Sequence, residues 1–135
     1  MKGQKVAATS LQYFSKGDQI LTGCADGQIQ IYDLRQSFRP SSQIAFAHKP
    51  GCEVTSLKIF RDSTKFASRS HDSTLKLWDM RNQKEPFLSW EDLECSVEKI
   101  QCSFSPNDKV IVTGTEAVKG KSMAQLVAFN TITGE

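Results

Sequence analysis

The chain has 135 residues, a formal net charge of +2 and 39% hydrophobic residues. This apolar content suits an ordinary core and argues against disorder, while the small charge argues against a strongly basic nucleic-acid binder. No run of 18 apolar residues and no secretory leader is visible, so we expect a soluble intracellular protein with no membrane contact. Its four cysteines are expected to be free thiols.

Short segments with apolar alternation or apolar runs, separated by turn residues, predict many short β-strands. In chain order they lie at 20–21, 28–32, 55–59, 74–78 and 110–112. The turn residues between or beside them lie at 16–18, 25–27, 71–73 and 106–108. The nearest candidate for a helix is 89–100, which has no sustained helical stripe. The sequence therefore predicts an all-β fold.

The predicted strands repeat along the chain. The pairs Tyr32-Asp33 and Trp78-Asp79 lie 46 residues apart, and the same spacing separates Thr22 from Ser68 and Asp26 from Asp72. A looser third copy places Thr113 45 residues after Ser68 and ends in Phe129-Asn130, with its extra length at 115–123. A period in the mid-forties with an aromatic-Asp ending is typical of a β-propeller blade.

The run Leu75-Lys76-Leu77-Trp78-Asp79, preceded by Ser68 and Asp72, resembles the WD-repeat family. The resemblance implies a WD-repeat β-propeller with about three four-stranded blades in residues 1–135, at approximately 6–47, 48–90 and 91–135. It places outer strands at 43–47 and 85–90. Propellers close with at least four blades, so we expect an incomplete part of a larger, seven-bladed propeller. Self-association of three-bladed fragments is the less favoured alternative.

The resemblance also assigns roles to four residues of the second copy. It implies that His48, Ser68, Asp72 and Trp78 form a hydrogen-bonded structural tetrad inside the blade. A Ser-His-Asp hydrolase is the alternative for the same residue types, but the spacing favours a blade core and no enzyme. The first and third copies lack parts of this set, so packing of Tyr32 and Phe129 is expected to compensate.

The candidate partner-binding residues follow the repeat as Asp33-Leu34-Arg35 and Asp79-Met80-Arg81. An Arg two residues after the Asp resembles the motif by which substrate receptors dock on the propeller adaptor of cullin-type ubiquitin ligases. The alternative is a rim Arg that pairs with its own Asp or is solvated. No pair among the two His and four Cys has zinc-ligand spacing, so neither a metal nor another cofactor is expected.

Three segments, 67–69, 72–81 and 104–115, resemble the gastrulation-defective group of WD-repeat proteins. That resemblance implies a non-enzymatic nuclear scaffold whose partners are a cullin-ligase adaptor or splicing factors. The alternative is a splicing-complex component that contacts RNA through the basic loop residues Lys119 and Lys121, together with Lys109. The modest charge favours a solubilising role for these lysines.

Overall fold

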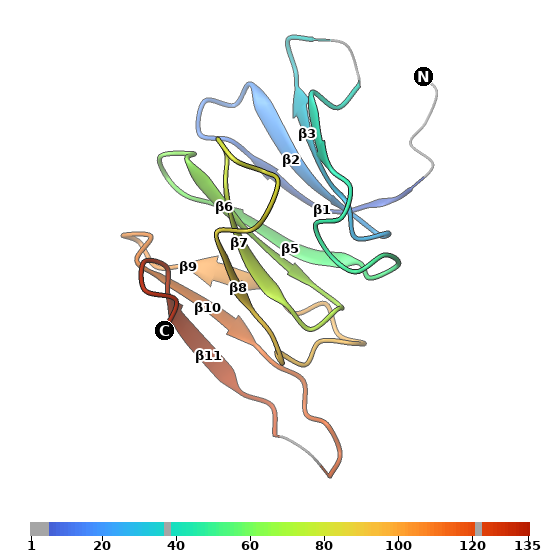
Figure 1. Cartoon of the computed structure of the whole chain (residues 1–135), viewed down its shortest axis with the longest axis vertical. Helices are drawn as coiled ribbons and strands as arrows, with labels where there is room; N and C mark the ends of the chain where they lie inside the picture. Colours follow the sequence, from blue (N-terminus) through green and yellow to red (C-terminus); the bar gives the residue numbers. More distant parts are fainter. Residues whose placement is uncertain (1–5, 37–38, 121–122) are drawn as a thin grey trace.

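A computed structural model describes residues 6–36, 39–120 and 123–135. Every regular element in these ranges is a β-strand, in agreement with the predicted all-β fold. The helix candidate at 89–100 is wrong, because Leu88–Trp90 is a strand and an irregular connection follows it. The strands form three antiparallel sheets that succeed one another along the chain (Figure 1).

Each sheet collects consecutive strands, so the architecture is a row of blades. The first sheet contains β1 (Ala8–Tyr13), β2 (Gln19–Cys24), β3 (Ile29–Asp33) and β4 (Ser42–Ile44). The second contains β5 (Val54–Ile59), β6 (Lys65–Ser70), β7 (Leu75–Asp79) and β8 (Leu88–Trp90). The third contains β9 (Cys102–Phe104), β10 (Val110–Gly114) and β11 (Leu126–Asn130), and thus three strands instead of the four expected.

The turns between the first two strands of each blade share one backbone conformation. Gly17, Ser63 and Asp108 occupy equivalent positions and all have positive φ, at 71°, 59° and 57°. A left-handed residue is needed at this point of the turn, and Gly, Ser and Asp accept it at tolerable cost. The turn residues at 16–18 and 106–108 therefore act as the sequence predicts.

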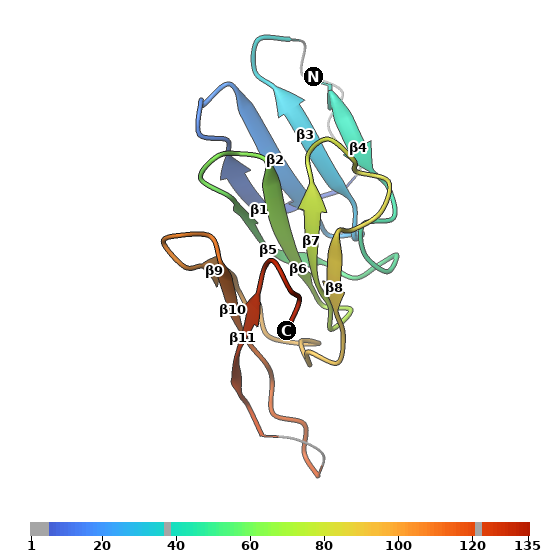
Figure 2. The same cartoon turned by 60° about the vertical axis from the view of Figure 1, so that its left-hand side comes forward.

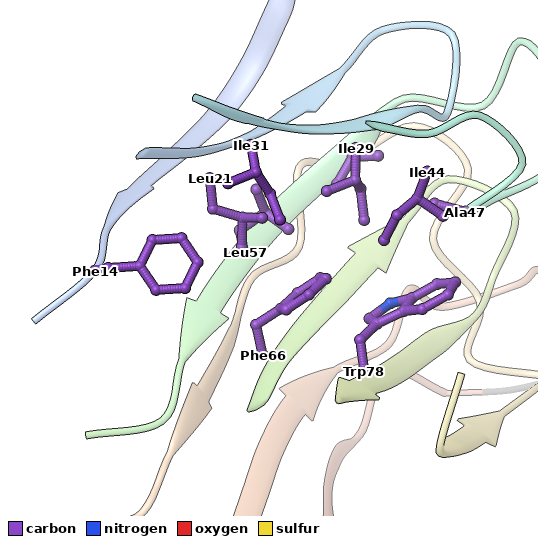
Figure 3. Packing of buried hydrophobic residues seen from close by; sticks show 10 residues of the cluster. Phe14, Leu21, Ile29, Ile31, Ile44, Ala47, Leu57, Phe66 and Trp78 are labelled. Atoms are coloured by element: carbon purple, nitrogen blue, oxygen red, sulfur yellow. The ribbon is translucent and has the colours of Figure 1, made fainter. Parts of the chain in front are cut away.

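A hydrophobic core lies between each pair of neighbouring sheets. Between the first two, Ile44 from the outer strand β4 belongs to the same buried cluster as Phe66 and Trp78 (Figure 3). The Phe66 and Trp78 rings stack with centroids 6.1 Å apart. Between the second and third sheets, Trp90 takes the place equivalent to Ile44 and stacks on Phe129 at 4.9 Å. In the first interface the indole is Trp78 and faces the smaller Ile44, whereas in the second interface the indole is Trp90 and faces Phe129, the equivalent of Trp78. The larger side chain at position 90 thus compensates for the smaller ring of Phe129.

Inner strands of neighbouring blades are fastened by a contact that repeats with the blades. β1 contacts β5, and β5 contacts β9. Thr9 Oγ1 donates to the carbonyl of Val54 at 2.8 Å, and the equivalent Thr55 Oγ1 donates to the carbonyl of Ile100, also at 2.8 Å. The repeated bond fixes the offset between blades, so the three sheets fan out in one sense (Figure 2).

Candidate functional site

The most buried polar residues of the second blade form a hydrogen-bonded chain. Trp78 Nε1–H donates to Ser68 Oγ at 2.9 Å, and Ser68 Oγ lies 2.7 Å from His48 Nε2. His48 Nδ1 lies 3.0 Å from Asp72 Oδ2. The structure thus brings together all four residues that the sequence placed in one tetrad, from β6, β7 and the two loops at one end of the blade.

The order of donors follows from the protonation state of His48. Burial lowers the pKa of His48, so the ring is neutral near pH 7. Burial also raises the pKa of Asp72, but hydrogen bonds from His48 and Thr74 outweigh it and leave that pKa below its usual value. Nδ1–H therefore donates to the Asp72 carboxylate, while Nε2 accepts from the Ser68 hydroxyl. Every member of the chain is satisfied.

The tetrad has the connectivity of a Ser-His-Asp triad but cannot act as one. Ser68 is fully buried, at 0% exposure, so no substrate carbonyl reaches its oxygen. The indole N–H of Trp78 already occupies that oxygen as a donor. A catalytic serine needs an open approach and a separate oxyanion site. The geometry is that of a structural hydrogen-bond network that links strands β6 and β7.

The equivalent positions of the other blades carry simpler bonds. Thr22 Oγ1 donates to the carbonyl of Gln30 at 3.2 Å, and Tyr32 Oη donates to Gln30 Oε1 at 2.8 Å. In the third blade, Thr113 Oγ1 donates to the carbonyl of Gln101 at 2.9 Å. These blades keep a hydroxyl at the tetrad position without the histidine and tryptophan. Only the second blade among the described residues has the full chain.

The two Asp-x-Arg segments adopt the same geometry at the ends of equivalent strands, β3 and β7. Arg35 Nε and Nη2 donate to the two carboxylate oxygens of Asp33 at 3.0 and 2.8 Å. Arg81 does the same to Asp79 at 3.2 and 3.0 Å. In both segments the backbone N–H of the Arg also donates to the Asp, at 3.0 and 2.8 Å. Each arginine is thus paired locally with its own aspartate.

This pairing fixes the guanidinium groups without hiding them. The side chains of Arg35 and Arg81 remain 67% and 84% exposed. The hydrogen bonds from each arginine lower the pKa of Asp33 and Asp79 to about 2, so both carboxylates are ionised at neutral pH. Nη1 of Arg35 faces Asp18 Oδ2 at 3.4 Å, whereas Nη1 of Arg81 has no partner among the described residues.

Antiparallel pairing places both segments on one face of the row of blades. The β1–β2 and β5–β6 turns and the β3–β4 and β7–β8 connections all lie at the same end of their sheets. We call this end the arginine face. The tetrad residues His48 and Asp72 belong to loops at the opposite end (Figure 2).

The lysines proposed for RNA contact do not form one patch. Lys119 is exposed in the loop between β10 and β11, whereas Lys109 precedes β10 and lies at the other end of that strand. Lys121 lies outside the described residues. The three lysines are neighbours in the sequence, but a strand separates Lys109 from the loop.

Two charged residues hold loops in place, and the sequence did not predict this role for either of them. The first is Arg69. Arg69 is fully buried and donates to Thr113 Oγ1 in the next blade and to the carbonyls of Ser70, Thr74 and Leu93. Burial lowers the pKa of its guanidinium. Its replacement of the glycine usual in such repeats was the one available signal, since Gly23 and Gly114 are its equivalents.

Glu116 is the second such organiser. Its carboxylate accepts hydrogen bonds from the backbone N–H groups of Val97 and Glu98 and from Ser96 Oγ, and thereby holds the β8–β9 connection. Burial raises the pKa of Glu116, but these bonds outweigh it and lower the pKa to about 2. Nothing in the local sequence marks this residue, because its partners lie about 20 residues away.

No group of three metal-ligating side chains gathers within the described ranges. The four cysteines are free thiols, three of them buried. No helix among the described residues has the length and apolarity to cross a membrane. Arg35 and Arg81 are exposed groups with defined geometry, and a guanidinium can pair with carboxylates or carbonyls.

Two four-stranded blades, a third blade of three strands and the buried tetrad identify a row of β-propeller blades, a class of repeat that generally serves as a protein–protein interaction scaffold. The family described as "WD domain, G-beta repeat" matches residues 1–33 and 41–79, more than half of the chain. The chain therefore belongs to the WD40-repeat family. The predicted fold class, part of a WD-repeat propeller, is confirmed.

The curated relatives narrow the family. The chain is 35% identical over 130 residues to Gastrulation defective protein 1 homolog from Drosophila melanogaster, covering 96% of this chain and 20% of that protein. It is 38% identical over 129 residues to WD repeat-containing protein 70 from Bos taurus, and this match also covers 96% of this chain and 20% of that protein. The Xenopus laevis protein of that name is 34% identical over 133 residues, which cover 98% of this chain and 21% of that protein. The predicted resemblance is confirmed, and the chain spans about a fifth of these relatives.

Proposed function

We propose that these blades belong to a nuclear, non-enzymatic scaffold that docks on the propeller adaptor of a cullin-type ubiquitin ligase. The observation that carries the proposal is the matched pair Arg35 and Arg81, held by Asp33 and Asp79 in one geometry in adjacent blades. A guanidinium already fixed by a carboxylate loses little conformational entropy when a partner binds its free edge. Two such groups on one face make a repeated, preorganised docking surface.

The docking role is tested by a pull-down with the purified adaptor. Because three blades do not close a ring, the blades are presented within a complete propeller. We expect Arg35→Ala combined with Arg81→Ala to weaken binding at least tenfold, whereas Arg61→Ala, an exposed arginine on the same face, leaves it unchanged. Undiminished binding by the double variant removes these arginines from the docking surface.

The nuclear location and the link to splicing complexes rest on the family resemblance. A role in RNA contact has less support, because Lys119 and Lys109 lie at opposite ends of β10. Affinity for single-stranded RNA that stays flat between low and moderate salt would argue against phosphate contacts.

A further inference from the structure

The connection between β8 and β9 binds a carboxylate at the end of the blades opposite the arginine face. Glu116 Oε1 accepts from the consecutive backbone N–H groups of Val97 and Glu98, the first at 2.9 Å, and Ser96 Oγ donates to Oε2 at 3.1 Å. Consecutive N–H groups that converge on one acceptor form an anion-binding nest. Residues 96–98 are such a nest, and Glu116 is the anion that fills it. We call this set of bonds the Glu116 latch.

The latch is local, because another contact holds the start of the connection. The buried Arg69 donates to the carbonyl of Leu93. Glu116 is bound through its backbone as well, since its N–H donates to the carbonyl of Glu94 at 2.7 Å. Opening the latch would therefore free Glu116 and residues 94–98 and leave the core between the blades intact.

The Ser96 hydroxyl is the group of the latch that can accept a phosphoryl group. Ser96 is exposed, and residues 91–101 have no regular secondary structure, so the hydroxyl is open to an enzyme. Carboxylates stand two residues before and two residues after it, at Glu94 and Glu98. This context suits a protein kinase that selects serines flanked by acidic residues.

We propose that Ser96 is a phosphorylation site and that its phosphate displaces Glu116 from the nest. An acid-directed protein kinase transfers the γ-phosphoryl group of MgATP to Ser96 Oγ. The proton of the hydroxyl passes to the base of the kinase, and ADP leaves. The product carries a charge of about −2 near pH 7 and three acceptor oxygens.

Phosphate and carboxylate cannot share the nest. Oε2 of Glu116 lies 3.1 Å from Ser96 Oγ, so a phosphate on Oγ that turns toward the nest occupies the space of the carboxylate. The two groups also repel each other, because the pKa of Glu116 is about 2 and both groups are anions near pH 7. The phosphate is attached to the chain, so it competes with Glu116 as an intramolecular ligand, which a free acidic ligand does not.

Release of Glu116 is tested with phosphoserine incorporated at position 96 during synthesis of a complete propeller, so that no kinase is needed. Protection of the Glu116 amide against hydrogen exchange measures the latch, because this N–H is bound to the carbonyl of Glu94. Phosphoserine at Ser89, which is exposed on β8, is the matched control. Unmodified Glu116→Ala shows the protection of the open state.

We expect phosphoserine at position 96 to lower the protection at least tenfold and the control at Ser89 to leave it unchanged. In the Glu116→Ala background, phosphoserine at position 96 should cause no further loss, because the latch is already open. Unchanged protection, or an equal further loss in the Glu116→Ala background, would overturn the displacement of Glu116.

The modification is tested with purified casein kinase 1 and MgATP on the unmodified complete propeller, with mass spectrometry to locate the phosphate. We expect phosphate on Ser96, and a higher rate in Glu116→Ala, where the hydroxyl no longer donates to a carboxylate. Phosphate confined to other residues would overturn the modification site, even where incorporated phosphoserine opens the latch. Neither outcome depends on docking to the adaptor, since the latch lies at the opposite end of the blades from Arg35 and Arg81.

Discussion

The buried hydroxyl at the tetrad position offers a quantitative test, because the same position occurs in each blade with different partners. Ser68→Ala removes one oxygen from the second blade and leaves the indole N–H of Trp78 and Nε2 of His48 without partners. Thr22→Val removes the equivalent oxygen from the first blade and keeps the shape of the side chain. There the hydroxyl donates one hydrogen bond, to the backbone carbonyl of Gln30.

The difference between the two variants follows from the number of groups left unsatisfied. Each buried polar group without a partner costs about 1–3 kcal/mol, so Ser68→Ala is expected to lower the free energy of unfolding by about 2–6 kcal/mol. Loss of the single bond of Thr22 is expected to cost about 0.5–1.5 kcal/mol. Both hydroxyls are buried, so exposure does not account for the difference.

Urea unfolding followed by tryptophan fluorescence measures both variants. With a slope of about 2 kcal/mol/M, Ser68→Ala should lower the urea midpoint by about 1 M or more, and Thr22→Val by well under 1 M. Equal shifts for the two variants would refute the claim that the hydrogen-bonded chain stabilises the second blade more than a lone hydroxyl stabilises the first.

Three further predictions concern the buried groups. Because the folded-state pKa of His48 lies below 6.5, the unfolded chain takes up its proton first as the pH falls below 6.5. Thermal melts should therefore show lower stability at pH 5 than at pH 8, with a smaller difference in His48→Gln. Gly23→Ala should cost about 1–3 kcal/mol in urea unfolding, since its Cβ would lie 2.5 Å from Val54 Cγ1, whereas Gly114→Ala meets no atom closer than 3.4 Å and should cost less. Arg69→Lys should cost about 3 kcal/mol by the same assay, because an ammonium group cannot reach the spread acceptors; an unchanged midpoint would contradict this.

The repeat made most of the fold predictable. Alternation and apolar runs located β2, β3, β5, β7 and β10, and the resemblance placed both outer strands near β4 and β8. The path of residues 89–100 could not be predicted in this way. That connection has no periodicity of its own, and contacts from Arg69 and Glu116 in other elements fix its path.

The candidate site was predictable from the residues themselves only where its contacts join residues that are close in the sequence. The Asp-x-Arg segments could be read directly, because each arginine pairs with an aspartate two residues before it. The packing of Met80 against the cluster that contains Phe14 could not be read in this way, because the two residues belong to different blades. Lys109 and Lys119 show the opposite case, since these residues are close in sequence but lie at opposite ends of one strand.

The affinity of the adaptor for a propeller carrying Arg35→Lys and Arg81→Lys tests the central claim most directly. The two lysines keep the positive charge but lose the planar fork that pairs with Asp33 and Asp79 and presents N–H groups outward. Isothermal titration should show at least tenfold weaker binding than the wild-type propeller. Affinity equal to wild type would contradict recognition through the geometry of the two guanidinium groups.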